Sequence, residues 1–524
     1  MEFINDTDNA NNIANLSPEQ QTAYFKYVQG ENIFITGPGG TGKSKLISDL
    51  IQQSKSINKK VQVCAMTGCA AILLNCNART LHSWSGIKLA KGTIDEVVTS
   101  VIRNKNISNV WKKTDILILD EVSMLSCKLF EIIEKIGRIV KKSSLPFGGI
   151  QVVFTGDFYQ LPPIGTHGEP DTNQFCFESK TWNQVFKPEN HIELKTIFRQ
   201  TDPIYINILQ QVRNGNLDKH NESILKTRLN PKYNEDEYNG CIPTKLFPLR
   251  SKTDYINKMM FDKLNEQEYV YNLTRKSDCI INLDNNKPLP TDVINKCLTL
   301  KKQEIDFELD TLSNGIQCPK ILRLKKGASV MCTINLDIDN SICNGSQGIV
   351  IDINNNGPIV KFANGIIKLI EPHYWQSEEY PMLAVGQYPL CLAWALTIHK
   401  MQGATLSIAE IDIGQGIFEY GQTYVALSRV KSLDGLYLSE FNPTKICANP
   451  IVSKFYNTMP KSNPVQITHT QIEPDKSDKT DKSDKSDNPD KSDKSDKSDK
   501  SDKSDKTDKT IKIINFDKYK YKYT

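Results

Sequence analysis

The sequence has few of the features that mark secreted, metal-binding or membrane proteins. Its thirteen cysteines include no C-x-x-C pair, and structural zinc needs paired ligands at short spacing. We therefore expect reduced thiols in a reducing compartment rather than a metal cluster or disulfides. No apolar run reaches the ~18 residues that span a bilayer, so we expect no membrane partner.

Neither the N-terminal segment nor the overall charge identifies a compartment or a partner. The first 17 residues are acidic, rich in asparagine and free of arginine, unlike a signal peptide or a mitochondrial presequence. The net charge of +4 over 524 residues does not by itself indicate nucleic-acid binding. Cytoplasm, nucleus and a viral replication site all stay open.

The length and the 39% of hydrophobic residues allow two to four domains with cores of their own. Apolar strand-like runs alternate with amphipathic helical stretches in two regions, which predicts parallel α/β sheets. Short β-like runs with Asn-Gly pairs at 344–345 and 364–365 interrupt the second region, which predicts hairpins and a small inserted β-barrel. The expected boundaries are 1–15 for a disordered tail, 16–190 for the first α/β domain, 191–268 with 380–459 for the second, 269–379 for the insertion, 460–510 for a linker and 511–524 for the C-terminus.

The C-terminal part has a different composition. Residues 475–510 are twelve triplets that begin with aspartate, nearly all Asp-Lys-Ser or Asp-Lys-Thr. Their charges nearly cancel and nothing apolar is present, which predicts a disordered spacer. The last 14 residues, "IKIINFDKYKYKYT", alternate lysine with tyrosine and could touch phosphates and bases, although an end that contacts nothing specific is the favoured interpretation.

A phosphate-binding loop is the strongest single motif. "NIFITGPGGTGKSKLI" contains G-x-x-x-x-G-K-S between an apolar strand and an amphipathic helix, the context that such a loop requires. Its glycines let backbone N–H groups surround phosphates at a helix N-terminus. We expect Lys43 to reach the β- and γ-phosphates of ATP and Ser44 to bind Mg²⁺. The expected ATP-binding residues here are Gly37, Pro38, Gly39, Gly40, Thr41, Gly42, Lys43 and Ser44.

Two further apolar runs should bring polar groups to the same sheet edge, where ligands bind in parallel α/β folds. "DILILDEVSML" ends in Asp120, which could hold the magnesium through water, and Glu121, which could act on the attacking water as a base. "IQVVFTGDFYQLPPI" raises a harder question, because Asp157 could simply cap a tight turn. With the phosphate loop nearby, we expect Gln160 to contact the γ-phosphate or the water, and the rigid prolines, including Pro162, to transmit its position to a DNA surface.

Together these stretches resemble the Pif (petite integration frequency) family of superfamily 1B DNA helicases over nearly all of residues 16–440. The resemblance rests on several motifs in the family's order: "LSPEQQ", "AMTGCAAILL" with "ARTLHSWSGI", "LDEVSML", "GDFYQLPP", "IFRQTDPIYINILQQVRNGN", "LAWALTIHKMQGATL" and "YVALSRVKSLDGLYL". It implies that both α/β domains are RecA-like P-loop domains.

The resemblance also implies roles for individual residues. Gln20 would read the adenine edge, and Arg199 and Arg429 would be arginine fingers supplied by the second domain. Such fingers neutralise charge on the transferred phosphoryl group. The implied DNA contacts in the first domain are Thr67, Gly68 and His82.

The loop "TIHKMQG" could touch both ligands. His399 and Lys400 combine a flat ring with a cation, which suits a base or sugar on one side and a phosphate on the other. Gln402 and Gly403 would then turn back toward the nucleotide. A single loop would thereby couple DNA to ATP.

We therefore expect an ATP-dependent, Mg²⁺-using helicase that works as a monomeric motor on single-stranded and forked DNA, with 5′ to 3′ movement implied by the resemblance. Replication, repair and recombination all stay open as pathways. A RecD-like subunit of a recombination complex and a nucleotide-switched DNA clamp are the alternatives. A Ras-like GTPase would carry N-K-x-D, which the sequence lacks.

Overall fold

The computed structural model describes residues 15–460 apart from 75, 77, 89, 167, 230–241, 284–286, 317, 338–339, 341 and 378–379. The expected linker and basic C-terminus, and nearly all of the expected N-terminal tail, lie outside this part of the chain. No helix in the described part is both long and apolar enough to cross a membrane.

The first domain is built on a six-stranded parallel sheet. Its strands are β1 (Ile33–Thr36), β2 (Val61–Ala65), β3 (Arg79–Thr80), β4 (Ile116–Asp120), β5 (Gln151–Thr155) and β6 (His191–Glu193). They are ordered β3-β2-β4-β5-β1-β6, and all neighbours are parallel. β1 and β4 are buried along their whole length, as expected for apolar strands covered on both faces. The carboxyl ends of β1, β4 and β5 carry the three predicted motifs.

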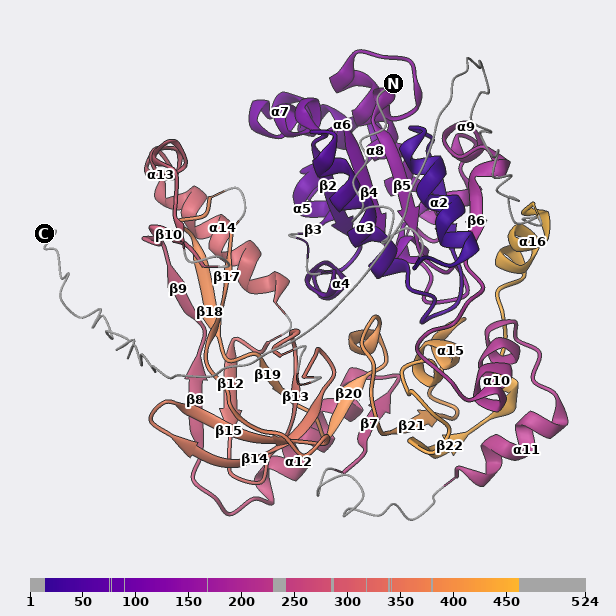
Figure 1. Ribbon diagram of the computed structural model, residues 1–524, viewed down its shortest axis with the longest axis vertical. Helices are drawn as coiled ribbons and strands as arrows, with labels where there is room; N and C mark the ends of the chain where they lie inside the picture. The colour runs from indigo at the N-terminus through magenta and orange to yellow at the C-terminus, as the bar shows by residue number, and fades with distance from the viewer. Residues whose placement is uncertain are drawn as a thin grey trace, which may run out of the picture. The chain divides into compact units, whose positions relative to one another are not determined.

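Helices cover both faces of this sheet (Figure 1). The α-helices are α2 (Pro18–Val28), α3 (Lys43–Ser56), α4 (Gly68–Leu73), α5 (Leu81–Ser85), α6 (Ile94–Arg103), α7 (Lys105–Lys113), α8 (Cys127–Lys141) and α9 (Trp182–Val185). The short 3-10 helices are η1 (Val122–Met124), η2 (Pro146–Gly149), η3 (Pro170–Thr172), η4 (Cys176–Glu178) and η5 (Pro188–Asn190). Alternation along β1 sends Phe34 into one core and Ile33 and Ile35 into another, so each face packs separately.

The second domain has a smaller parallel sheet. Its strands are β7 (Thr244–Phe247), β20 (Ala395–Thr397), β21 (Ala409–Ile413) and β22 (Leu436–Phe441). They are ordered β20-β7-β21-β22 and are parallel throughout. The helices are α10 (Pro203–Arg213), α11 (Lys219–Thr227), α12 (Arg250–Asp262) and α15 (Gln422–Leu427), with 3-10 turns η7 (His399–Met401) and η8 (Pro443–Lys445). The predicted pair of parallel α/β sheets is confirmed.

An antiparallel module is inserted between α12 and β20 (Figure 1). Its strands are β8 (Tyr269–Asn272), β9 (Thr274–Lys276), β10 (Ile281–Asn282), β11 (Lys287–Pro288), β12 (Ile321–Leu324), β13 (Ser329–Cys332), β14 (Gln347–Asn354), β15 (Gly357–Phe362), β16 (Ile367–Leu369), β17 (His373–Gln376), β18 (Ala384–Gln387) and β19 (Leu390–Leu392), and its helices are α13 (Thr291–Leu298) and α14 (Lys302–Gly315).

The pairings of the module refine the sequence prediction. Both Asn-Gly pairs lie between antiparallel neighbours, β13 with β14 and β15 with β16, so the predicted hairpins are confirmed. The described strands form a five-stranded sheet, β16-β15-β14-β13-β19, beside a three-stranded sheet, β17-β18-β9, and two pairs. A closed barrel therefore stays a prediction, as do the domain boundaries. The antiparallel pairing continues through β19, beyond the expected end at residue 379.

The last described helix, α16 (Pro450–Thr458), follows the second sheet in the chain but packs on the first domain. Val452 belongs to the core that contains Phe34 and Trp182. The Phe455 ring stacks on Phe177 with centroids 4.2 Å apart. The chain therefore crosses from the first domain to the second and returns.

Candidate nucleotide site and nucleic-acid cleft

The phosphate loop connects β1 to α3, as its sequence predicts. Gly40 and Gly42 have φ angles of +89° and +79°, a region that residues with a Cβ atom rarely adopt. The Lys43 ammonium donates to the carbonyls of Gly37 and Pro38 at 2.8 and 3.0 Å. Burial lowers the pKa of Lys43, while nearby carboxylates, including Glu121, oppose that shift. The loop thus surrounds a buried ammonium at the N-terminus of helix α3.

The predicted acid pair lies at the end of β4. Asp120 accepts a hydrogen bond from Thr155 at the end of β5 and from the Glu121 N–H at 2.9 Å. Burial raises the pKa of Asp120. Burial first, and then Asp120, raise the pKa of Glu121 to about 7. The Gln402 amide donates to Glu121 Oε2 at 2.9 Å, so the loop from the second domain touches the candidate base directly.

Gln160 and Gln20 both lie at the edge of the nucleotide cleft. Gln160 is buried and follows a turn that Asp157 caps, since the Tyr159 N–H donates to Asp157 Oδ1 at 3.2 Å. Gln20 completes a capping box with Ser17, and its amide donates to the Thr41 carbonyl at 3.2 Å. Gln20 therefore connects helix α2 to the phosphate loop. Its contact with adenine stays a prediction.

Two arginines meet at the phosphate loop, Arg429 from the second domain and Arg199 from the connection between β6 and α10. A Cβ atom built on Gly39 would lie 3.4 Å from Arg199 Nη1 and 3.5 Å from Arg429 Nη2. Arg199 donates to the Ser428 carbonyl at 3.0 Å, and Arg429 donates to Ser428 Oγ at 2.7 Å. Burial, and then the charge of Arg199, lower the pKa of Arg429 to about 9. Such proximity of two cations is costly unless an anion lies between them.

These residues surround a cleft of about 790 Å³. Of the predicted nucleotide residues, those that line it are Gln20, Gly39, Gly40, Thr41, Gly42, Lys43, Ser44, Asp120, Glu121, Gln160, Arg199, Gly403 and Arg429. Gly37, Pro38 and Gln402 instead hydrogen-bond to residues of that lining. The cleft thus combines cations, acids and backbone amides, as a nucleoside triphosphate requires.

Sequence reasoning missed eight lining residues: Asn15, Leu16, Lys45, Asp49, Phe198, Cys343, Thr405 and Lys431. Phe198 and Lys431 could have been predicted from the sequence, because each lies within two residues of an expected arginine finger. Cys343 comes from the inserted module, and no motif of the sequence connects that module to the nucleotide.

A second cleft, of about 290 Å³, lies between the first domain and the inserted module. Gly68, an expected DNA contact, lines it, and a Cβ atom built there would lie 2.5 Å from the Gly315 carbonyl oxygen of α14. Sequence reasoning did not identify its other polar and aromatic lining, which includes Arg79, Thr80, Ser83, His373, Tyr374 and Trp375. Arg79, hydroxyls and rings in one cleft suit a nucleic-acid strand, although the carboxylate of Glu308 also lines it.

The other expected DNA residues do not line this second cleft. Thr67 accepts from the Ala70 N–H at 3.1 Å at the start of α4. The His399 ring stacks on Phe418 at 6.1 Å, and burial lowers its pKa. Burial likewise lowers the pKa of His82. Lys400 is exposed and Pro162 is half-buried. Their contacts with DNA stay predictions.

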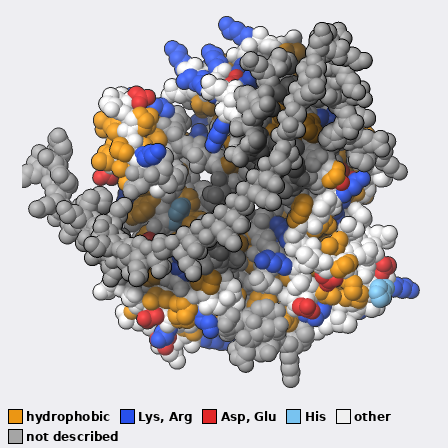
Figure 2. All heavy atoms as spheres, in the orientation of Figure 1, with side chains coloured by type: hydrophobic (Ala, Val, Ile, Leu, Met, Phe, Trp, Pro, Cys, Tyr) orange, Lys and Arg blue, Asp and Glu red, His pale blue; other side chains and the backbone are white. Residues whose placement is uncertain are grey.

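A third feature is a basic surface at one end of the first domain. Figure 2 shows Lys and Arg side chains gathered where Figure 1 has α6 and α7. The Lys141 ammonium donates to the Lys112 carbonyl at 2.8 Å. Burial lowers the pKa of Lys141, and the charge of Lys59 adds to that shift. Clustered charges of one sign raise the local potential in a way that the net charge of the whole chain does not reveal.

Two parallel α/β domains, with a phosphate loop and an acid pair on one and an arginine from the other that meets Arg199 at that loop, define a two-domain P-loop nucleoside triphosphatase. The family described as PIF1-like helicase matches residues 15–223, and the DNA helicase Pif1 2B domain matches residues 309–353.

Individual relatives agree with these matches. The ATP-dependent DNA helicase PIF1 of Xenopus laevis is 32% identical over 460 residues, which cover 86% of this chain and 66% of that protein. The crystal structure of Pif1 helicase from Candida albicans is 33% identical, with a TM-score of 0.63, and the match covers 84% of this chain and 99% of that one. Pif1 helicase from Bacteroides, in complex with ADP-AlF3 and single-stranded DNA, is 28% identical with a TM-score of 0.56 over 84% and 96% of the two chains.

The chain belongs to the PIF1-like helicase family, as its motifs predicted. It spans about two thirds of the length of the curated relatives it matches, 66% for the protein from Xenopus laevis.

Proposed function

We propose that this protein is an ATP-dependent DNA helicase that moves 5′ to 3′ along single-stranded DNA and unwinds duplex or folded DNA ahead of it. The observation that carries this proposal is the meeting of Arg199 and Arg429 beside Gly39. Arg429 belongs to the second domain, and Arg199, in the connection between β6 and α10, donates to the Ser428 carbonyl of that domain, so hydrolysis depends on how the two domains close. That dependence is what a motor needs in order to convert turnover into movement.

The residues of the cleft divide the chemistry among them. Lys43 exchanges its loop carbonyls for the β- and γ-phosphates, and Gln160 orients the γ-phosphate or the water. Glu121 accepts the proton of the attacking water, and its pKa near 7 suits that task. The two arginines then stabilise the charge on the transferred phosphoryl group.

The donor set fits a magnesium ion. Ser44 and Asp120 line the same cleft, and hydroxyl and carboxylate oxygens are ligands that Mg²⁺ prefers. The ion would supply charge neutralisation between the phosphates. Thr155 and the Glu121 N–H keep the Asp120 carboxylate oriented toward the cleft edge by their hydrogen bonds to it.

We propose that single-stranded DNA passes through the second cleft. Support comes from its lining, where Arg79 and the hydroxyls of Thr80 and Ser83 share the cleft with the ring of Trp375. The relative from Bacteroides was solved with single-stranded DNA. Binding of this kind is salt-dependent and tolerant of sequence. A DNA substrate would place the protein in a nucleus, the cytoplasm or a viral replication site.

We expect Arg79→Ala to weaken binding of single-stranded DNA and to reduce the slope of log K against log salt by about 0.7, because one phosphate contact on a single strand is lost. Fluorescence anisotropy of labelled oligonucleotides over a salt series would measure both. Lys226→Ala is the matched control, since Lys226 pairs with Glu222 on the outer helix α11. An unchanged slope in Arg79→Ala would remove this cleft from the DNA path.

The test of the proposed function is ATP hydrolysis with and without single-stranded DNA, alongside unwinding of duplexes that carry a 5′ or a 3′ tail. Lys43→Ala serves as the blank. We expect DNA-stimulated hydrolysis and unwinding from the 5′ tail alone. Hydrolysis without unwinding would favour a clamp or an obligate partner, and absence of DNA stimulation would overturn the helicase proposal.

A further inference from the structure

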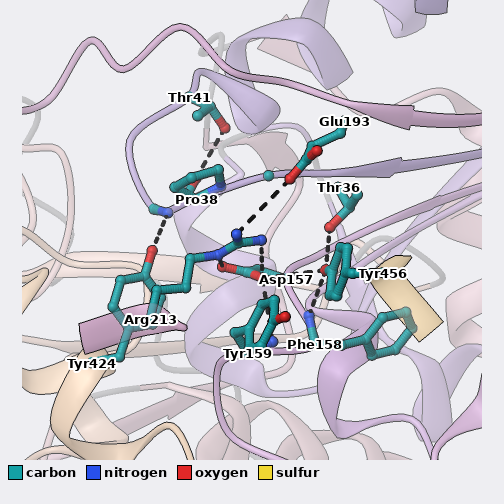
Figure 3. Close-up of polar contacts among 12 residues, drawn as sticks. Thr36, Pro38, Thr41, Asp157, Phe158, Tyr159, Glu193, Arg213, Tyr424 and Tyr456 are labelled. Atoms are coloured by element: carbon teal, nitrogen blue, oxygen red, sulfur yellow. Dashed lines mark hydrogen bonds and ion pairs between the residues drawn. The ribbon is translucent and has the colours of Figure 1, made fainter. Parts of the chain in front are cut away.

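The returning helix α16 delivers one hydroxyl to the centre of the first domain. Tyr456 Oη lies 2.5 Å from Thr36 Oγ1 and accepts from the Phe158 N–H at 3.1 Å (Figure 3). It also donates to Asp157 Oδ1 at 3.3 Å. Thr36 is the residue before Gly37 of the phosphate loop, and Asp157 begins the turn that ends in Gln160. One hydroxyl thus connects the residue before the phosphate loop to the first residue of the turn that carries Gln160.

The Tyr456 hydroxyl has a partner for its proton and for both of its lone pairs. A phenol has one proton to donate and two lone pairs. The Asp157 carboxylate can only accept from it, so the Tyr456 proton goes to Asp157 and the two lone pairs accept from Thr36 and the Phe158 N–H. Burial, and then the charge of Asp157, raise the pKa of Tyr456 well above its usual value. The hydroxyl therefore keeps the proton that this arrangement needs.

The second domain also binds Asp157. Arg213, the last residue of α10, donates to both Asp157 oxygens at 2.9 Å, and both side chains are buried. Its guanidinium lies 4.6 Å from the centroid of the Tyr159 ring and 5.3 Å from that of Tyr456. The two rings stack 4.8 Å apart at 12° (Figure 3). A buried, bidentate ion pair holds its geometry tightly, because breaking it leaves an unpaired charge.

We propose that Tyr456 is a positioning residue of the ATPase: through Thr36 and Asp157 it holds the phosphate loop and the Gln160 turn in one register, at the point where Arg213 attaches the second domain. This inference rests on the proposed function for its kinetic consequence. Tyr456 does not line the nucleotide cleft, so it acts through Thr36 and Asp157. Its loss should leave nucleotide binding in place and misalign Gln160 when the domains close.

The test is Tyr456→Phe in the full chain, which removes the hydroxyl and keeps the stacked ring. We expect DNA-stimulated kcat to fall about 3- to 10-fold, as for one lost buried hydrogen bond, while KM for ATP stays within about twofold. Tyr24→Phe is the matched control, because it removes a hydroxyl that bonds Gln53 at 2.8 Å in the same domain. Equal loss in both variants, or no loss in Tyr456→Phe, would overturn the inference.

Two further measurements separate this inference from the proposed function. Thr36→Val removes the Oγ1 atom that bonds the Tyr456 hydroxyl. If the two residues act through this bond, the loss of DNA-stimulated kcat in the double variant should be no greater than the larger loss in a single variant, because the effects of coupled partners are not additive. Amide hydrogen exchange needs no turnover. Tyr456→Phe should speed exchange in residues 36–42 and in 156–160 together, whereas Tyr24→Phe should speed it in neither. Unchanged exchange in both segments would reject the positioning role even if the helicase proposal stands.

Discussion

Arg429→Ala is expected to lower DNA-stimulated kcat for ATP by about 10³- to 10⁵-fold, the range that arginine fingers contribute. The reason is geometric, because the Arg429 guanidinium lies beside Gly39 together with Arg199. Its positive charge acts when negative charge spreads over the transferred phosphoryl group. Steady-state hydrolysis at saturating ATP and single-stranded DNA would measure the loss, and equilibrium binding of a nucleotide analogue would show that the ground state is much less affected.

The variant must be separated from a merely unfolded protein. Arg429 also donates to the carbonyls of Val425 and Ala404 at 2.8 and 3.3 Å, so its removal costs stability in the second domain. Arg228→Ala is the matched control, since Arg228 donates to two carbonyls of the same domain at 2.8 Å. A loss below about tenfold in folded Arg429→Ala would contradict a finger role, and so would an equal loss in Arg228→Ala.

The sequence predicts the nucleotide site well because its parts share one sheet edge. Residues 37–44, Asp120 and Gln160 each follow an apolar run, and parallel strands must end on the same side. The structure accordingly brings Lys43, Glu121 and Gln160 into one cleft. The arginines could be assigned only through resemblance, because nothing local to Arg199 or Arg429 says which surface each will face.

Contacts across long stretches of chain lay beyond sequence reasoning. A turn cap was one of the possible roles of Asp157, and it does cap a turn, but its main partner is Arg213, 56 residues later. Residues 450–458 fall within the range expected for the second domain, although the aromatic side chains of the helix they form, α16, pack on the core of the first. Composition does not identify the surface on which a helix packs when that surface is formed by strands far earlier in the chain.

Glu121→Gln is the second large effect that we expect. Loss of a general base costs about 10²- to 10⁴-fold in rate, and the glutamine cannot accept the proton of water. The change keeps the shape of the side chain and its place beside Gln402, so ATP binding should persist. Steady-state hydrolysis with single-stranded DNA, together with nucleotide binding, would measure both. A variant that keeps more than a tenth of the activity would mean that another group takes the proton.

The pKa of Glu121 gives this substitution a second readout that needs neither metal nor nucleotide. Folding raises the pKa of Glu121 from 4.5 to about 7, so the folded state binds this proton more tightly than the unfolded chain does. Its contribution to stability is therefore complete below pH 4.5 and is lost as the pH rises through about 7, by about 1.4 kcal/mol per pH unit between those two values. Glutamine stays neutral, so Glu121→Gln should gain stability over the wild type as the pH rises across that window.

Urea unfolding at pH 5 and pH 8 would measure this difference in the free energy of unfolding. Glu222→Gln is the control, because Glu222 lies on the outer helix α11, away from the acid pair. The control should follow the wild type at both pH values, whereas Glu121→Gln should diverge from it at pH 8. If the free energies of unfolding of wild type and Glu121→Gln changed in parallel with pH, the Glu121 carboxyl would already be charged in the folded protein at pH 5. That result would contradict a general base with a pKa near neutral pH.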